Sequence, residues 1–258
     1  MAVRRRPARE APGQHFLRSS RLAANLVAEA QVARGDLVVE IGGGTGVLTQ
    51  AIVRTGAEAV VIERDSALVA HLRARFRQPG TVEIVLADAA EYVWPERPFV
   101  VVANLPFARS GAILGHLLRD PRTPLRRALV IVQWEFAAKH AAIWPATLRS
   151  SYWRAWYDVT IAGRLARTAF SPPPRVDAAV LSFEQRMQPR VPVASHDSYW
   201  RFLSGAFSSQ QPIRRALLPA LSPLQIKRLA PTLGFTADAR ARDLDARQWA
   251  GLFAAAAG

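Results

Sequence analysis

The chain has 258 residues, half of them hydrophobic, which is enough for one α/β domain with a small appendage and excludes global disorder. Its 34 Lys and Arg against 20 Asp and Glu give a net charge of +14, which favours a polyanionic partner such as nucleic acid. With no cysteine, no secretory signal and no long apolar stretch, we expect a cytoplasmic protein without disulfides, cysteine metal sites or membrane contact.

Residues 1–12 form a basic arm that contains proline, and we expect it to be flexible. Leu22–Val32 predicts an amphipathic helix, with Arg34-Gly35-Asp36 as the turn that follows. Apolar runs then alternate with helical patterns. The predicted strands are Leu37–Ile41, Ala59–Glu63, Val82–Leu86, Phe99–Ala103 and Ala128–Gln133, with helices at Val47–Arg54 and Ser66–Phe76. This alternation is typical of a parallel sheet covered on both faces.

The pattern changes after Trp156. Asp158–Leu165 and Val176–Glu184 predict two strands joined by the Pro-rich loop Ser171-Pro172-Pro173-Pro174, best read as a closing antiparallel hairpin. About seven strands in one sheet result. Gln188 to Val193 looks like a linker, and short helices are predicted at Tyr199–Phe207, Ile213–Leu218, Pro223–Ala230 and Ala246–Ala256. This helical part carries a basic cluster that could contact RNA or be a solvated face: Arg214, Arg215, Lys227, Arg228, Arg240 and Arg242.

A glycine-rich loop, Glu40-Ile41-Gly42-Gly43-Gly44-Thr45-Gly46, leads from the first strand into the next helix. A dinucleotide site would require a third glycine where Val47 stands, and Glu40 would repel a pyrophosphate but attract a methionyl ammonium. The next two strands end near Glu63, which can accept ribose hydroxyls, and Asp88, which can accept an adenine amine. The pattern predicts an S-adenosylmethionine site made of Glu40, Gly42, Gly44, Gly46, Glu63, Asp88 and Ala89.

The fourth strand runs directly into Asn104-Leu105-Pro106-Phe107. An arylamine is a poor nucleophile because its lone pair is delocalised, so methyl transfer to it needs acceptors for both N–H groups. The Asn104 side-chain oxygen and the Leu105 carbonyl can serve, because Pro106 stiffens the turn. Phe107 can stack on a flipped adenine and face a sulfonium. We interpret residues 104–107 as a catalytic tetrad for an adenine amine, with Asn104 also beside the cofactor and no general base required.

Together these motifs resemble the ribosomal RNA adenine N6-dimethyltransferase family over nearly the whole chain. The resemblance also covers Gly13-Gln14-His15-Phe16-Leu17 and the segment Phe170–Asp177, which is similar to the family's F-x-P-x-P-x-V-D. It implies a Rossmann-like methyltransferase domain at residues 13–187 and a small all-helical RNA-binding domain at residues 188–258, acting on ribosomal RNA. By similarity Gln14, His15 and Leu17 would line the cofactor, and Phe170 would help to hold the target adenine.

Two features look more like the macrolide-resistance (Erm) branch, which modifies 23S rRNA, than like the housekeeping branch, which modifies 16S rRNA. They are the stretch Leu129–His140 and the basic tail Ala108-Arg109-Ser110, so we place Arg109 among the substrate-binding residues. Phe107 departs from the commoner tyrosine, and Phe207–Pro212 is polar where this family would have a more basic run. The alternatives are a housekeeping 16S dimethyltransferase, a non-catalytic RNA-binding factor and a DNA adenine methyltransferase. Nothing in the sequence demands a dimer, so we expect a monomer.

Overall fold

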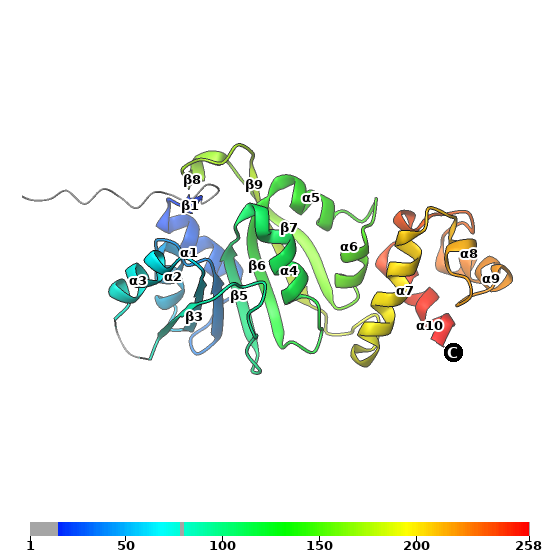
Figure 1. The fold of residues 1–258 in the computed structure, drawn as a ribbon, viewed down its shortest axis with the longest axis horizontal. Coiled ribbons are helices and arrows are strands. Elements are labelled where there is room, and N and C mark those ends of the chain that lie inside the picture. The colour runs from blue at the N-terminus through cyan, green and yellow to red at the C-terminus, as the bar shows by residue number, and fades with distance from the viewer. Residues whose placement is uncertain (1–14, 78–79, 258) are drawn as a thin grey trace, which may run out of the picture.

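The computed structural model describes residues 15–77 and 80–257 (Figure 1). The basic arm expected at residues 1–12 and the predicted cofactor residue Gln14 lie outside the described residues.

Seven strands form one sheet in the order β4-β3-β2-β5-β6-β9-β7. Every neighbouring pair is parallel except those that involve β9, which runs antiparallel to both β6 and β7. The strands are β2 (Leu37–Ile41), β3 (Glu58–Glu63), β4 (Val82–Leu86), β5 (Phe99–Asn104), β6 (Leu125–Gln133), β7 (Tyr157–Leu165) and β9 (Ala178–Gln185). The predicted seven-stranded α/β sheet is confirmed, and so is the antiparallel pairing of its last two strands.

Helices cover both faces of the sheet (Figure 1). They are α1 (Ser20–Glu29), α2 (Val47–Val53), α3 (Ser66–Arg75), α4 (Ser110–Leu117), α5 (Trp134–Ala141) and α6 (Leu148–Trp153). The side chains of Ser19 and Asp65 cap α1 and α3 by accepting backbone N–H groups. Every residue of β2, and of β5 up to Ala103, is buried, as expected for central strands between two helical layers.

A second, two-stranded ladder pairs β1 (Phe16–Leu17) with β8 (Phe170–Ser171) in antiparallel register. Leu17 lies opposite Phe170, and both side chains are buried. The ladder therefore joins the N-terminal segment to the Pro-rich loop, two motifs that are far apart in the sequence, and Figure 1 places them side by side.

The C-terminal part is helical: α7 (His196–Ser208), α8 (Ile213–Ala216), α9 (Pro223–Leu233) and α10 (Ala246–Ala257). It lies at the end of the molecule next to α6 (Figure 1). Tyr152 stacks on Tyr199 of α7, and Trp156 packs edge-on against the same ring, so one hydrophobic cluster continues from the sheet into these helices. Among the described residues, no helix has both the length and the apolar character that crossing a membrane requires.

Candidate active site

A cavity of about 1090 Å³ opens at the carboxyl ends of the parallel strands. The neighbours of β2 are β3 on one side and β5 on the other, so the chain's winding reverses at this point. Ligands of open α/β sheets bind at such a switch point. The cavity is lined by the ends of β2 to β5 and the segments that follow them, by the last residue of β6, by His15 and Phe16, and by residues 173–176 of the Pro-rich loop.

The glycine loop forms one wall of the cavity. Gly44 has φ +52°, and a Cβ there would lie 2.8 Å from the ring of Phe16. Gly42 has φ +80°, and a Cβ there would meet the backbone oxygen of Asn104 at 3.4 Å. The loop thus runs close to β1 and to the tetrad, and only glycine leaves this space open.

Glu63 is fixed by three backbone donors. Its carboxylate accepts hydrogen bonds from the backbone N–H groups of Gly44 at 3.1 Å, Arg64 at 2.8 Å and Asp65 at 3.0 Å. The side chain is buried yet lines the cavity. A carboxylate held in this way is pre-oriented to accept the hydroxyls of a ribose.

Asp88 lines the cavity just after the end of β4 and forms an ion pair with Arg109. One carboxylate oxygen accepts the N–H of Ala90 at 2.9 Å, and the other lies 2.5 Å from a guanidinium nitrogen of Arg109. The hydrogen bond from Ala90, and then the charge of Arg109, hold the pKa of Asp88 below its ordinary value, so the group is a charged acceptor at neutral pH. Both residues and Ala89 line the cavity, so Arg109 connects the tail of the tetrad to the predicted adenine end of the cofactor site.

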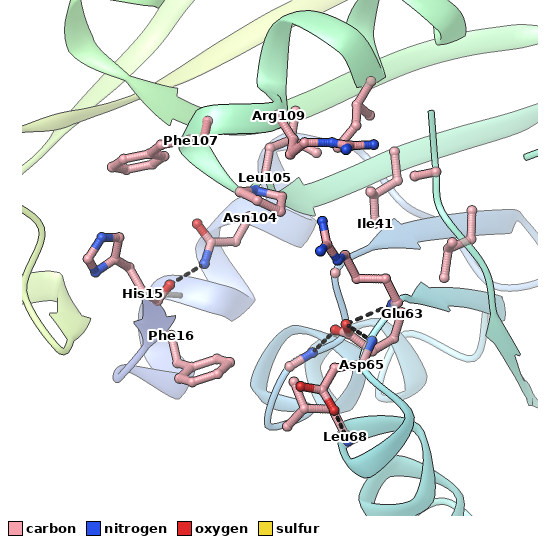
Figure 2. A pocket seen from close by; sticks show the side chains of 18 of the residues that line it. His15, Phe16, Ile41, Glu63, Asp65, Leu68, Asn104, Leu105, Phe107 and Arg109 are labelled. Carbon is pink, nitrogen blue, oxygen red and sulfur yellow. Dashed lines mark hydrogen bonds between the residues drawn. The ribbon is translucent and has the colours of Figure 1, made fainter. Parts of the chain in front are cut away.

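Asn104 is oriented by the N-terminal segment. Its side-chain nitrogen donates to the backbone oxygen of His15 at 2.7 Å (Figure 2). Because the nitrogen is engaged, the side-chain oxygen is left as the free acceptor of the amide. The N–H of Leu105 donates to Ile131 of β6 at 3.1 Å, which fixes the backbone of the tetrad against the sheet.

Phe107 lies between His15 and Phe170. Its ring centroid is 5.7 Å from that of His15 and 6.3 Å from that of Phe170, with an edge-on arrangement toward the latter. The Nδ1 of His15 donates to the backbone oxygen of Pro172 at 2.8 Å. The β1–β8 ladder therefore holds the aromatic ring that would stack on a target base.

The structure places Glu40 differently from the expectation. Its side chain does not line the cavity; it is 1% exposed and accepts a 2.6 Å hydrogen bond from the Thr49 hydroxyl of α2. Burial, reinforced by the charge of Glu63, raises the pKa of Glu40 from 4.5 to about 8. The raised pKa favours the neutral form of this carboxyl. Instead of lining the cavity, it ties β2 to the helix that follows the glycine loop.

Three further predicted residues support the cavity without lining it: Leu17, Gly46 and Phe170. Sequence reasoning missed several residues that do line it, including Phe16, Ile41, Ile62, Asp65 and Leu68. Ile41 could have been identified, because neighbouring residues of a strand point to opposite faces, so Glu40 and Ile41 cannot both face the ligand. Within residues 15–77 and 80–257, no group of three or more His, Asp and Glu could hold a metal ion.

The residues present fit S-adenosylmethionine. Two acidic side chains, Glu63 and Asp88, lie at the ends of neighbouring strands where a nucleoside would need acceptors. The glycine loop provides a cradle that side chains would fill, beside the tetrad. The cavity extends from this cradle to Phe107, which leaves room for a second molecule beside the cofactor.

Comparison with known proteins shows the family and the fold of the chain. The sequence pattern of the family described as Ribosomal RNA adenine dimethylase matches residues 6–257. The rRNA adenine N-6-methyltransferase of Bacillus licheniformis is 27% identical over 93% of this chain and 84% of that protein. Ribosomal RNA small subunit methyltransferase A of Thermosynechococcus vestitus is 31% identical over 95% of each chain. Among solved structures, the 23S rRNA methyltransferase ErmE superposes with a TM-score of 0.82, at 23% identity over 94% of this chain and 100% of that one.

Proposed function

The chain belongs to the ribosomal RNA adenine dimethylase family and is an S-adenosylmethionine-dependent rRNA adenine-N6 methyltransferase; from this premise we propose that its target is an adenine of 23S rRNA. The modification would confer resistance to macrolide, lincosamide and streptogramin antibiotics. On this proposal the enzyme acts as a monomer in the cytoplasm. The observation that carries the catalytic part is the orientation of Asn104, whose side-chain nitrogen is engaged by His15 and whose oxygen is left to accept.

When bound, S-adenosylmethionine supplies an electrophilic methyl group on its sulfonium. The Asn104 side-chain oxygen and the Leu105 carbonyl accept the two N–H groups of the target amine, which turns the nitrogen lone pair toward the methyl carbon. Phe107 stacks on the flipped base, Phe170 supports that ring edge-on, and Arg109 contacts the RNA. The methylated amine loses its proton to water, so no side chain has to act as a base.

Glu63 and Asp88 would hold the nucleoside part of the cofactor, together with Gly42, Gly44 and Ala89. His15 acts by contacting Asn104 and Phe107, and Leu17 acts through the β1–β8 ladder, where it lies opposite Phe170. Gln14 keeps its predicted role on the resemblance alone.

The basic tetrad tail and the stretch Leu129–His140 support the 23S target. A second candidate, methylation of 16S rRNA in small-subunit assembly, is favoured by the 31% identity to enzymes named for the small subunit. The two predict different substrates. The test incubates the enzyme with labelled cofactor and either protein-free 23S rRNA or immature small subunits, and then maps the modified base. We expect label at one adenine of 23S rRNA. We also expect that a susceptible host tolerates a higher macrolide concentration when it produces the enzyme. Label confined to small subunits would refute the 23S assignment.

Replacement of the tetrad asparagine tests the mechanism. Asn104→Ala removes the acceptor, and we expect methyl transfer to fall by at least about 100-fold while the cofactor still binds by calorimetry. Asn104→Asp is the matched variant because it keeps an acceptor oxygen but loses the donor to His15. Turnover near that of the wild type in Asn104→Ala would refute the assignment.

A further inference from the structure

Gln133, the last residue of β6, lines the active-site cavity but belongs to neither the glycine loop nor the tetrad. Because side chains alternate along a strand, Gln133 shares its face of the sheet with Ile131, which belongs to the hydrophobic cluster that packs against Phe107. Ala178, the residue directly opposite Gln133 on β9, belongs to the same cluster. The side chain of Gln133 therefore extends toward the part of the cavity where the target base would lie.

Gln133 also lies close to Asn104. The strands β5 and β6 are parallel neighbours, and Asn104 is in register with Ile131. Gln133 is therefore one strand across and two residues further along, which corresponds to about 5 Å and about 7 Å. Val102 of β5 belongs to the same cluster as Ile131, so Asn104 and Gln133 are on the same face. A base whose amine is bound by Asn104 would lie within reach of the Gln133 amide.

The backbone of Gln133 is fixed, whereas its amide is free. The residue is the N-cap of α5, yet its side chain makes no capping hydrogen bond and finds no other partner within residues 15–77 and 80–257. Its backbone pairs with Ala178, and the N–H of Trp134 donates to the backbone oxygen of Asp177 at 3.0 Å. The amide is thus held at the cavity with its donors available to a ligand.

The tetrad alone does not identify the base. The Asn104 side chain and the Leu105 carbonyl accept two N–H groups, and the amine of cytosine offers the same two donors as the amine of adenine. The rings differ beside that amine. Adenine has the acceptor N7 at the position where cytosine has only a C–H group, so a donor that faces N7 distinguishes the two bases.

We propose that Gln133 donates a side-chain N–H to N7 of the target adenine and so favours adenine over cytosine. The inference rests on the tetrad roles proposed above and adds a residue that reads the ring rather than the amine. Glutamine is suited to this role, because its amide nitrogen donates to N7 in the usual pairing of glutamine with adenine. Phe107 stacks on the face of the base, which leaves the edge of the base open to Gln133.

The test combines one variant of the enzyme with two analogues of the target base. Gln133→Met keeps the length of the side chain but cannot donate a hydrogen bond. In a synthetic rRNA fragment, 7-deazaadenosine at the target position keeps the amine and lacks N7, whereas 1-deazaadenosine lacks N1 and is the matched control. The measurement is kcat/KM for methyl transfer. The fragment comes from whichever rRNA the wild type methylates, so the test does not depend on the 23S assignment.

We expect 7-deazaadenosine to lower kcat/KM of the wild type by about 5- to 10-fold, the effect of one lost hydrogen bond. Gln133→Met should lose the same factor on adenosine and nothing more on 7-deazaadenosine, because the bond can be lost only once. The effect of 1-deazaadenosine should be the same in both enzymes. Gln185→Met changes an exposed glutamine at the opposite end of β9 and should behave as wild type.

The decisive quantity is the ratio of two substrates in one enzyme, so a general loss of activity through misfolding cancels. Losses that add when Gln133→Met acts on 7-deazaadenosine would overturn the proposal, and so would an unchanged kcat/KM of Gln133→Met on adenosine. A loss that fails to add with 1-deazaadenosine instead would refute the assignment to N7. Failure of the tetrad mechanism is distinguishable, because Asn104→Ala would then stay active whatever the coupling between Gln133 and N7.

Discussion

Glu40 makes the stability of the fold dependent on pH in an unusual direction. Its pKa is 4.5 as an ordinary carboxyl and about 8 in the folded chain. Between these values the folded protein keeps a proton that the unfolded chain has lost. This retained proton stabilises the folded state fully below about pH 4.5. The stabilisation falls as the pH rises from 4.5 to about 8 and is gone above about pH 8.

The perturbation is Glu40→Gln, which keeps an acceptor for the Thr49 hydroxyl but cannot ionise. For a single group the free energy of unfolding changes by about 1.4 kcal/mol per pH unit inside the window. Between about pH 5.5 and 7.5, wild type should therefore lose about 2.7 kcal/mol relative to the variant.

The assay is urea unfolding of both proteins at a series of pH values, since other titrating groups cancel in the difference between them. Glu91→Gln makes the same chemical change at an exposed position and serves as the control. A difference between wild type and Glu40→Gln that does not vary with pH would refute the reasoning.

Three further predictions concern the active site. Phe107→Ala should lower the rate of methyl transfer, measured with labelled cofactor, by roughly 10- to 100-fold, because stacking on a base is worth about 1–3 kcal/mol. Phe107→Tyr should stay near wild type, and equal losses in the two variants would mean that the ring does not stack on the base. Gly44→Ala should weaken cofactor binding in calorimetry and lower the free energy of unfolding by about 1–3 kcal/mol, because φ of Gly44 is +52° and an added Cβ would lie 2.8 Å from Phe16. Cofactor affinity equal to that of the wild type would contradict this packing. Arg109 competes with the cofactor for Asp88, so Arg109→Gln should raise cofactor affinity. The gain should be at most about 5-fold, because the partly exposed ion pair is worth at most about 1 kcal/mol. Turnover on RNA should fall, and weaker cofactor binding would show that Arg109 does not compete for Asp88.

The sheet and the cofactor end of the site were predictable because their signals are local. Apolar parallel strands that end at Glu63 and Asn104, and two residues before Asp88, place these side chains at one edge of the sheet. The sequence interpretation placed the Glu40 side chain in the cofactor site because a negative charge precedes the glycine loop. It did not take into account that side chains alternate between the two faces of a strand.

Other features depend on contacts that sequence patterns do not contain. The helices α4, α5 and α6 have only six to eight residues, too few to establish a helical period, and α5 follows β6 without an intervening turn residue. The strands β1 and β8 have two residues each, so only the folded chain reveals that they pair.

The β1–β8 ladder has a consequence for how the enzyme is made. His15 and Pro172, whose hydrogen bond borders the tetrad, are 157 residues apart. Closing so long a loop costs conformational entropy before any contact compensates for it, and such pairings form slowly. A ribosome must therefore synthesise about two thirds of the chain before the ring of Phe107 acquires both of its aromatic supports. A shorter chain would already contain β2 to β6 but would lack the Phe170 and Pro172 that support the ring, so RNA capture has to wait until about two thirds of the polypeptide has been made.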